Sequence, residues 1–182
     1  VDQDAKMLRS RATLIICPNH LCAQWFTEIA TMISVPDLKV ISMLTKTHFE
    51  KYTYMDVLDA DFVIMSFNLL GNPCFTSKYI PSISPSKSYY KSVTYNRELV
   101  SKLFQKQSEI LTHNPQTLFE VQPMFPYIKW HRIIIDEFHE AYTVAKYQFV
   151  KNLIPLLKST YRWVLTGTPF DKDINCFNEM LN

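Results

Sequence analysis

The chain has 182 residues and only two glycines, where average usage would give about 13. Gly71 and Gly167 lie far apart and neither precedes a lysine, which excludes a phosphate-binding P-loop and a dinucleotide-binding fingerprint. A hydrophobic content of 47% excludes collagen-like, linker-like and disordered chains, and a net charge of +2 is too small to indicate a nucleic-acid partner by itself.

The size of the chain fits one domain with a full hydrophobic core. Cys17, Cys22, Cys74 and Cys176 form no CxxC pair, which predicts free, mostly buried thiols in a reducing, intracellular compartment. No apolar run approaches the ~18 residues of a membrane span, so we expect no membrane partner. Both ends look cut, which predicts that the sequence is a piece of a larger protein.

Five short apolar runs predict strands at residues 13–17, 39–43, 62–65, 132–135 and 162–165. Their continuous apolarity is typical of strands buried on both faces of a parallel sheet. The first two runs are separated by a predicted helix, in which apolar residues recur at helical spacing from Leu21 to Ile33. A later helix is predicted over 144–158, weakened by Pro155. This alternation predicts an α/β fold that binds its ligands beyond the carboxyl ends of the strands.

Residues 71–128 interrupt this alternation. Prolines and serines between 73 and 88 predict an irregular stretch, and a helix is predicted over 96–112. Six basic and two acidic residues lie between 78 and 110, a local charge of +4. We interpret the stretch as a solvated insertion, with a phosphate-contacting surface as the alternative.

The string WHRIIIDEFHEA (130–141) carries the clearest chemistry. An acidic pair at the end of a buried strand is costly unless a cation lies beside it, and Mg²⁺ on nucleotide phosphates is the usual one. Asp136 would hold the ion through its water shell, Glu137 would polarise the attacking water, and His139 would relay the state of the site. The alternative is that the carboxylates cap the next helix.

Other catalytic and metal-binding patterns are incomplete. The second histidine of an HExxH zinc motif is missing after His139, and His20 with Cys22 lacks a partner pair at zinc-site spacing. A GxSxG serine nucleophile is also missing.

A second informative string, YRWVLTGTPF (161–170), places Thr166, Gly167, Thr168 and Pro169 directly after a strand. Two hydroxyls beside the acidic pair would distinguish a bound phosphate from a hydrolysed one. Taken alone, the string is equally typical of a simple turn.

Two strand ends are candidates for contacts with a nucleic-acid backbone. Asn19 follows Pro18 at the first strand-to-helix junction, where free backbone N–H groups suit a phosphate. Ser66 and Asn68 follow a later strand in the same way. Trp25 is more typical of a core residue than of a base-stacking platform.

Four strings, taken in order, resemble the Swi/Snf-type branch of the superfamily-two helicase-like ATPases: TLIICPNHLCAQWFTEI (motif Ia), FVIMSFNLL (motif Ib), WHRIIIDEFHE (motif II) and YRWVLTGTPF (motif III). The resemblance covers the chain except for 71–128. It implies a three-layer RecA-like lobe over 1–182, incomplete at its N-terminus, with 71–128 as an insertion before motif II. This would be the first of two lobes in a motor that moves along double-stranded DNA using ATP and Mg²⁺.

The resemblance also implies roles for individual residues. Asp136 and Glu137 would be the Walker B pair, and Thr166 to Pro169 would couple hydrolysis to movement. Asn19, His20, Gln24 and Trp25 would lie in the region that contacts the DNA backbone. Motors of this kind remodel chromatin, repair DNA or regulate transcription, which places the protein in the nucleus, and the insertion would be a site for protein partners.

Two positions depart from the family pattern. A small residue is usual where Phe138 stands, and a glutamine–asparagine pair often follows TGTP, where this chain has Phe170, Asp171 and Lys172. An insertion before motif II resembles the subgroup with RING-finger modules, but this one has no cysteine–histidine ring.

The alternative function is a non-catalytic RecA-like scaffold that binds DNA or protein. A metal-dependent nuclease is disfavoured because no further carboxylate follows another predicted strand. We predict that the 182 residues alone do not hydrolyse ATP, because they lack the loop and lysine that hold the β- and γ-phosphates.

Overall fold

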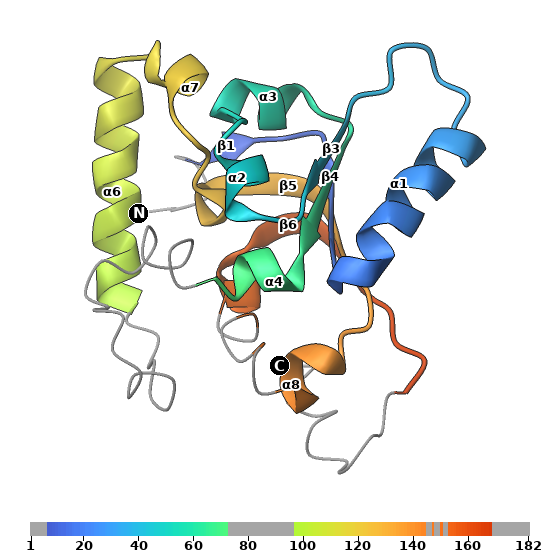
Figure 1. Ribbon diagram of the computed structural model, residues 1–182. Helices are drawn as coiled ribbons and strands as arrows, with labels where there is room; N and C mark the ends of the chain where they lie inside the picture. Colours follow the sequence, from blue (N-terminus) through green and yellow to red (C-terminus); the bar gives the residue numbers. More distant parts are fainter. Residues whose placement is uncertain (1–6, 73–96, 145–146, 148–149, 151–152, 169–182) are drawn as a thin grey trace.

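The computed structural model describes residues 7–72, 97–144, 147, 150 and 153–168 (Figure 1). Its centre is a sheet whose described strands are all parallel. The strands are β1 (Leu8–Arg9), β2 (Thr13–Cys17), β3 (Val40–Met43), β4 (Phe62–Ser66), β5 (Ile128–Ile135) and β6 (Lys158–Val164). β6 pairs with one edge of β5. Along the other edge of β5, β1 pairs with the first two residues and β2 pairs with the last four. The order across the sheet is therefore β3, β4, β2, β5 and β6, with β1 on the same side of β5 as β2.

The central strand β2 shows why the fold has three layers. All five of its residues are buried. Because successive side chains of a strand point to opposite faces, Leu14 and Ile16 lie in a large core cluster, whereas Ile15 and Cys17 lie in a smaller one on the other face. The α/β fold with a mainly parallel sheet is therefore confirmed.

Helix α1 (Asn19–Met32) covers the smaller cluster, to the right of the sheet in Figure 1. Short elements contribute the large cluster on the opposite face. These are α2 (Lys46–Phe49), α3 (Tyr54–Asp59), α4 (Phe67–Leu70), the 3-10 turn η3 (Phe125–Tyr127) and the 3-10 turn η5 (Ile154–Leu156). Each of α2, α3 and α4 begins after a Thr or Ser whose side chain accepts a backbone N–H of the first turn.

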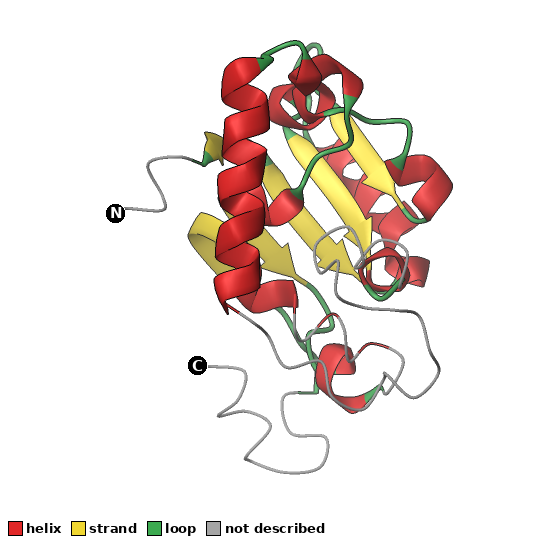
Figure 2. Cartoon of the chain, turned by 90° about the vertical axis from the view of Figure 1, so that its left-hand side faces the viewer, coloured by secondary structure: helices red, strands yellow, loops and turns green. Residues whose placement is uncertain are grey.

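The helix predicted over 96–112 is α6 (Arg97–His113), which Figure 2 shows standing beside the sheet and which is followed by α7 (Thr117–Glu120). The irregular stretch predicted between 73 and 88 lies outside the described residues. At the end of 71–128, Met124, Phe125 and Tyr127 are buried in the large cluster. This part of the proposed insertion is thus continuous with the core, and the boundaries of the insertion stay a prediction.

Two expectations were wrong near the end of the chain. The described part of 144–158 is not one helix: after α8 (Glu140–Thr143), Pro155 lies in the short turn η5 and β6 begins at Lys158. Pro155 cannot donate the backbone hydrogen bond that a longer helix needs. Strand β6 is also not buried, with Trp163 54% exposed, and β5 is its one strand neighbour among the described residues.

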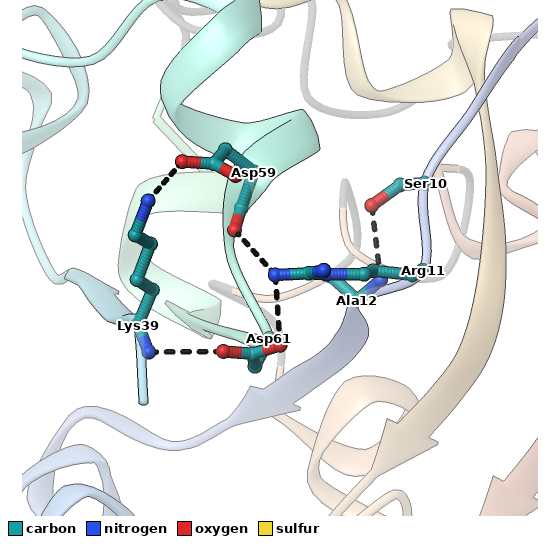
Figure 3. Close-up of polar contacts among 6 residues, drawn as sticks. All are labelled: Ser10, Arg11, Ala12, Lys39, Asp59 and Asp61. Atoms are coloured by element: carbon teal, nitrogen blue, oxygen red, sulfur yellow. Dashed lines mark hydrogen bonds and ion pairs between the residues drawn. The ribbon is translucent and has the colours of Figure 1, made fainter. Parts of the chain in front are cut away.

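The amino ends of three strands are joined by a polar cluster (Figure 3). Asp61 accepts the backbone N–H of Lys39 at 3.0 Å and pairs with the Arg11 guanidinium at 3.3 Å. Arg11 also donates to the backbone oxygen of Asp59, whose carboxylate pairs with the Lys39 ammonium. The cluster ties together the starts of β2, β3 and β4, at the opposite end of the strands from the motifs. No helix of the described residues has the length and apolarity to cross a membrane.

Candidate active site at the carboxyl ends of the strands

The strand register brings all four motifs to one end of the sheet. Ile16 pairs with Ile135, Ile135 pairs with Val164, and Cys17 pairs with Ser66. Residues that follow β2, β4, β5 and β6 are therefore neighbours, as expected for a site beyond the carboxyl ends of parallel strands.

Asp136 follows β5 directly and has a fixed orientation. Its backbone N–H donates to Ile16 O at 2.9 Å, which extends the ladder between β2 and β5 by one residue. The carboxylate accepts one hydrogen bond on each oxygen: Trp25 Nε1–H donates to Oδ2 at 2.9 Å, and the Glu137 backbone N–H donates to Oδ1 at 2.9 Å. The remaining lone pairs are available to other donors.

Glu137 has a φ of 49°, in the left-handed region that costs free energy for residues other than glycine. The next residue, Phe138, is 2% exposed within the large core cluster, and its N–H donates to Leu165 O at 3.1 Å. The left-handed turn thus comes between a buried strand and a buried phenyl ring, while the Glu137 side chain itself is 34% exposed. The bulky Phe138, a departure from the family pattern, is accommodated as a core residue.

His139 connects the string after β5 with the string after β6. Its Nδ1 is hydrogen-bonded to Thr166 Oγ1 at 2.8 Å and lies 3.2 Å from Glu137 Oε2. Thr166 Oγ1 also accepts the backbone N–H of Thr168 at 3.2 Å. The predicted proximity of the acidic pair and the threonines is therefore present in the structure.

The donor set fits a hydrated divalent cation. Among the described residues, no lysine or arginine forms an ion pair with Asp136 or Glu137, and no three His, Cys, Asp or Glu side chains are grouped as a metal cage. Mg²⁺ is commonly bound through one or two carboxylates and keeps several waters. Asp136, with its carboxylate held in place, would be the residue to hold such an ion.

The motif Ia residues separate into two groups on α1. His20 and Gln24 are exposed and Asn19 is half-buried, near the start of the helix. Trp25 instead packs against the smaller core cluster and directs its indole N–H to Asp136. The DNA contacts of these four residues stay a prediction.

Two buried thiols, Cys17 at the end of β2 and Cys22 on α1, face each other between the helix and the sheet. Cys17 Sγ and Cys22 Sγ are 3.5 Å apart, and both cysteines are free. The hydrogen bond with Cys22, together with burial, raises the pKa of Cys17 well above its usual range. The free, buried state predicted for the cysteines is confirmed for these two, whereas Cys74 and Cys176 lie outside the described residues.

The remaining candidates differ in accessibility. Asn68 is exposed, but Ser66 is fully buried; its hydroxyl donates to Leu44 O at 2.8 Å and accepts the Leu69 N–H at 3.0 Å. The DNA contact predicted for Ser66 stays untested, although its hydroxyl already has two partners. A Cβ on Gly167 would meet no atom within 4 Å, and Pro169 lies outside the described residues.

Comparison with known proteins places this geometry in a family. The family model described as "SNF2-related domain" matches residues 1–182. The chain belongs to this family. The SNF2-related domain is of the Swi/Snf type of superfamily-two helicase-like ATPase that the four motifs resemble, and its fold is the α/β RecA-like lobe.

One relative of this SNF2-related domain is a Schizosaccharomyces pombe protein named as an uncharacterized ATP-dependent helicase. It is 26% identical over 176 residues, which are 94% of this chain and 14% of the relative. The chain thus spans a small part of the length of that protein.

Sequence reasoning selected the acidic pair, the histidine and the threonines but missed how they are held. The indole–carboxylate bond joins residues 111 positions apart, and no local pattern indicates it. The left-handed backbone at Glu137 was missed because the position carries neither glycine nor asparagine.

Proposed function

We propose that this SNF2-related domain is the water-activating half of the ATP site of a motor that translocates on double-stranded DNA. One observation carries the proposal: His139 Nδ1 lies 3.2 Å from Glu137 Oε2 and is hydrogen-bonded to Thr166 Oγ1 at 2.8 Å, beside the fixed Asp136 carboxylate. These contacts link the acidic pair to the string that follows the next strand.

The residues would divide the work as follows. A bound Mg²⁺ would neutralise charge on the ATP phosphates, and Asp136 would hold it through its water shell. Glu137 would orient and polarise the attacking water. His139 would transmit the state of the site to Thr166 and Thr168, which with Gly167 and Pro169 would couple hydrolysis to movement.

DNA would contact the same end of the sheet from α1 and α4. The exposed Asn68, His20 and Gln24, with Asn19, support this placement, because side chains near helix starts suit phosphate contacts. A second RecA-like lobe of the parent protein would supply the opposite wall of the site. Roles in chromatin remodelling or DNA repair, a nuclear location, and protein partners bound by 71–128 follow from the family resemblance and are part of the proposal.

The test is DNA-stimulated phosphate release by the whole protein. We expect Glu137→Gln to lower kcat by at least 100-fold, on the order of general-base loss, because the amide cannot polarise water. Glu140→Gln is the matched control, since Glu140 lies in the same acidic string but at the start of α8, and it is expected to retain activity.

Equal rates for the wild-type protein and Glu137→Gln would contradict the motor and favour the non-catalytic scaffold. DNA cleavage with Mg²⁺ and without ATP would instead favour a nuclease.

A further inference from the structure

Trp25 makes a contact that its predicted role does not explain. It lies on α1 among residues expected to face DNA, yet its indole N–H donates to Asp136 Oδ2 at 2.9 Å. A hydrogen bond to an ionised carboxylate is among the stronger hydrogen bonds in proteins.

The indole is held by its surroundings. Its ring packs against the smaller core cluster, which includes Cys22 and Ile29 of α1 and Ile134 of β5. An indole packed in this way has little freedom to rotate, so the direction of its N–H is set by the position of α1 on the sheet.

The orientation of the Asp136 carboxylate depends on the Trp25 indole N–H. Its other oxygen accepts only the N–H of the next residue, Glu137, whose backbone is in the left-handed region. Without Trp25, the one donor left to the carboxylate among the described residues would lie on that short turn. The indole is therefore the contact that ties the carboxylate to a regular element outside its own loop.

We propose that Trp25 is a positioning residue that fixes the Asp136 carboxylate for the cation and makes its orientation depend on the position of helix α1. Because α1 also carries the exposed His20 and Gln24, a DNA contact on the helix would reach the cation through one side chain. This inference rests on the proposed function, and it adds a physical route from DNA to the ATP site.

The test uses the whole protein and a fluorescent ADP analogue, titrated in Mg²⁺ and separately in EDTA. Trp25→Phe retains an aromatic ring in the cluster and removes the donor. We expect the gain in ADP affinity that Mg²⁺ gives to be about tenfold smaller in this variant than in the wild-type protein, as for the loss of a hydrogen bond to a charge. Affinity in EDTA should stay within about twofold, because the cation is absent there.

A second measurement separates positioning from simple damage. Trp25→Phe should lower the DNA-stimulated kcat about tenfold, while the DNA concentration for half-stimulation changes less than about twofold, since His20 and Gln24 are retained. The matched control is Trp130→Phe, which removes the N–H of a fully buried indole that has no hydrogen-bond partner among the described residues. It should lower thermal stability and leave the Mg²⁺ response as in the wild-type protein.

The outcomes distinguish the two proposals. If Mg²⁺ has no effect on ADP binding by the wild-type protein, the proposed ATP site fails and this inference fails with it. If the wild-type protein responds to Mg²⁺ and Trp25→Phe responds equally, or loses affinity equally in EDTA, the inference alone is overturned.

Discussion

Glu137 combines a proposed chemical role with an unfavourable backbone. Its φ of 49° and that of Asp37, at 60°, are the two positive values at non-glycine positions among the described residues. A left-handed conformation costs an L-residue roughly 1–2 kcal/mol. At Glu137 this cost occurs at a residue whose carboxylate lies 3.2 Å from His139 Nδ1, which is itself hydrogen-bonded to Thr166. Strain retained at such a position is typical of functional sites.

The first prediction follows from that backbone. Glu137→Gly should raise the free energy of unfolding by up to about 1 kcal/mol, and it should abolish ATP hydrolysis because the carboxylate is lost. Asp37→Gly makes the same backbone change in a remote turn, so it should be neutral or stabilising and fully active. Urea unfolding and phosphate release measure the two properties; a destabilised Glu137→Gly would contradict the strain argument.

The second prediction concerns the ring at the next position. Phe138→Ala restores the small residue that is usual in the family, but here it removes a phenyl group that is 2% exposed within the large core cluster. We expect a loss of about 3–5 kcal/mol in the free energy of unfolding. Thermal unfolding is the measurement, with Phe138→Leu as a milder control; an unchanged melting temperature would show that the surrounding side chains close the cavity.

At the scale of elements, the two ends of the strands carry different kinds of residues: structural polar contacts at one end and the candidate site at the other. The polar cluster of Figure 3 joins strands at their amino ends, whereas the motif residues gather at their carboxyl ends. Substitutions at the first end should therefore affect folding without affecting chemistry.

Asp61 gives the third prediction. Asp61→Ala removes the acceptor of the Lys39 N–H and the partner of Arg11. The free energy of unfolding should fall by about 1–2 kcal/mol, mainly through the backbone hydrogen bond, since exposed ion pairs contribute little. Urea unfolding measures this loss, and kcat per folded molecule should stay at the wild-type value. A large loss of kcat would mean that the two ends of the strands are coupled.

Buried elements were predictable from the sequence, and elements defined by their neighbours were not. The run 13–17 matches β2 because all five residues are buried and the four after Thr13 are apolar. β5 begins four residues before the predicted 132, at Ile128, because pairing with β1 and β6 extends it through polar positions such as Lys129 and His131. The start of β6 at Lys158 likewise depends on its pairing with β5.

The candidate site was predictable to a similar degree. Motif spacing located Asp136, Glu137, His139 and Thr166, and the structure brings them together. The roles of the DNA-contact residues stay predictions. The fixed orientation of Asp136 depends on a contact between α1 and β5, which only the packed sheet creates.

At the scale of the whole molecule, β6 leaves large apolar side chains exposed. Tyr161, Trp163 and Val164 of β6 and the following Leu165 are between 39% and 54% exposed, and β6 has one strand neighbour among the described residues. The Arg132 guanidinium lies over the Trp163 ring, 5.2 Å from its centroid. An apolar strand at a sheet edge favours pairing with another chain.

The fourth prediction follows for these 182 residues expressed alone. They should self-associate at micromolar concentration, and a Tyr161→Lys, Trp163→Lys double variant should shift them toward monomer, because charges on an edge strand oppose pairing. Light scattering after size-exclusion chromatography measures the mass. A wild-type chain that stays monomeric would show that this strand is protected.

The position of β2 in the sheet also has a consequence for biosynthesis. One edge of β2 pairs with β4, starting from Thr13 beside Phe62. Its other edge pairs with β5, where the partner of Thr13 is Arg132, which is synthesised 119 residues later. At roughly 5–20 residues per second, that delay is on the order of ten seconds on the ribosome. During it, β2, whose residues are all buried in the finished lobe, has one unpaired edge, and an unpaired edge favours pairing with another chain.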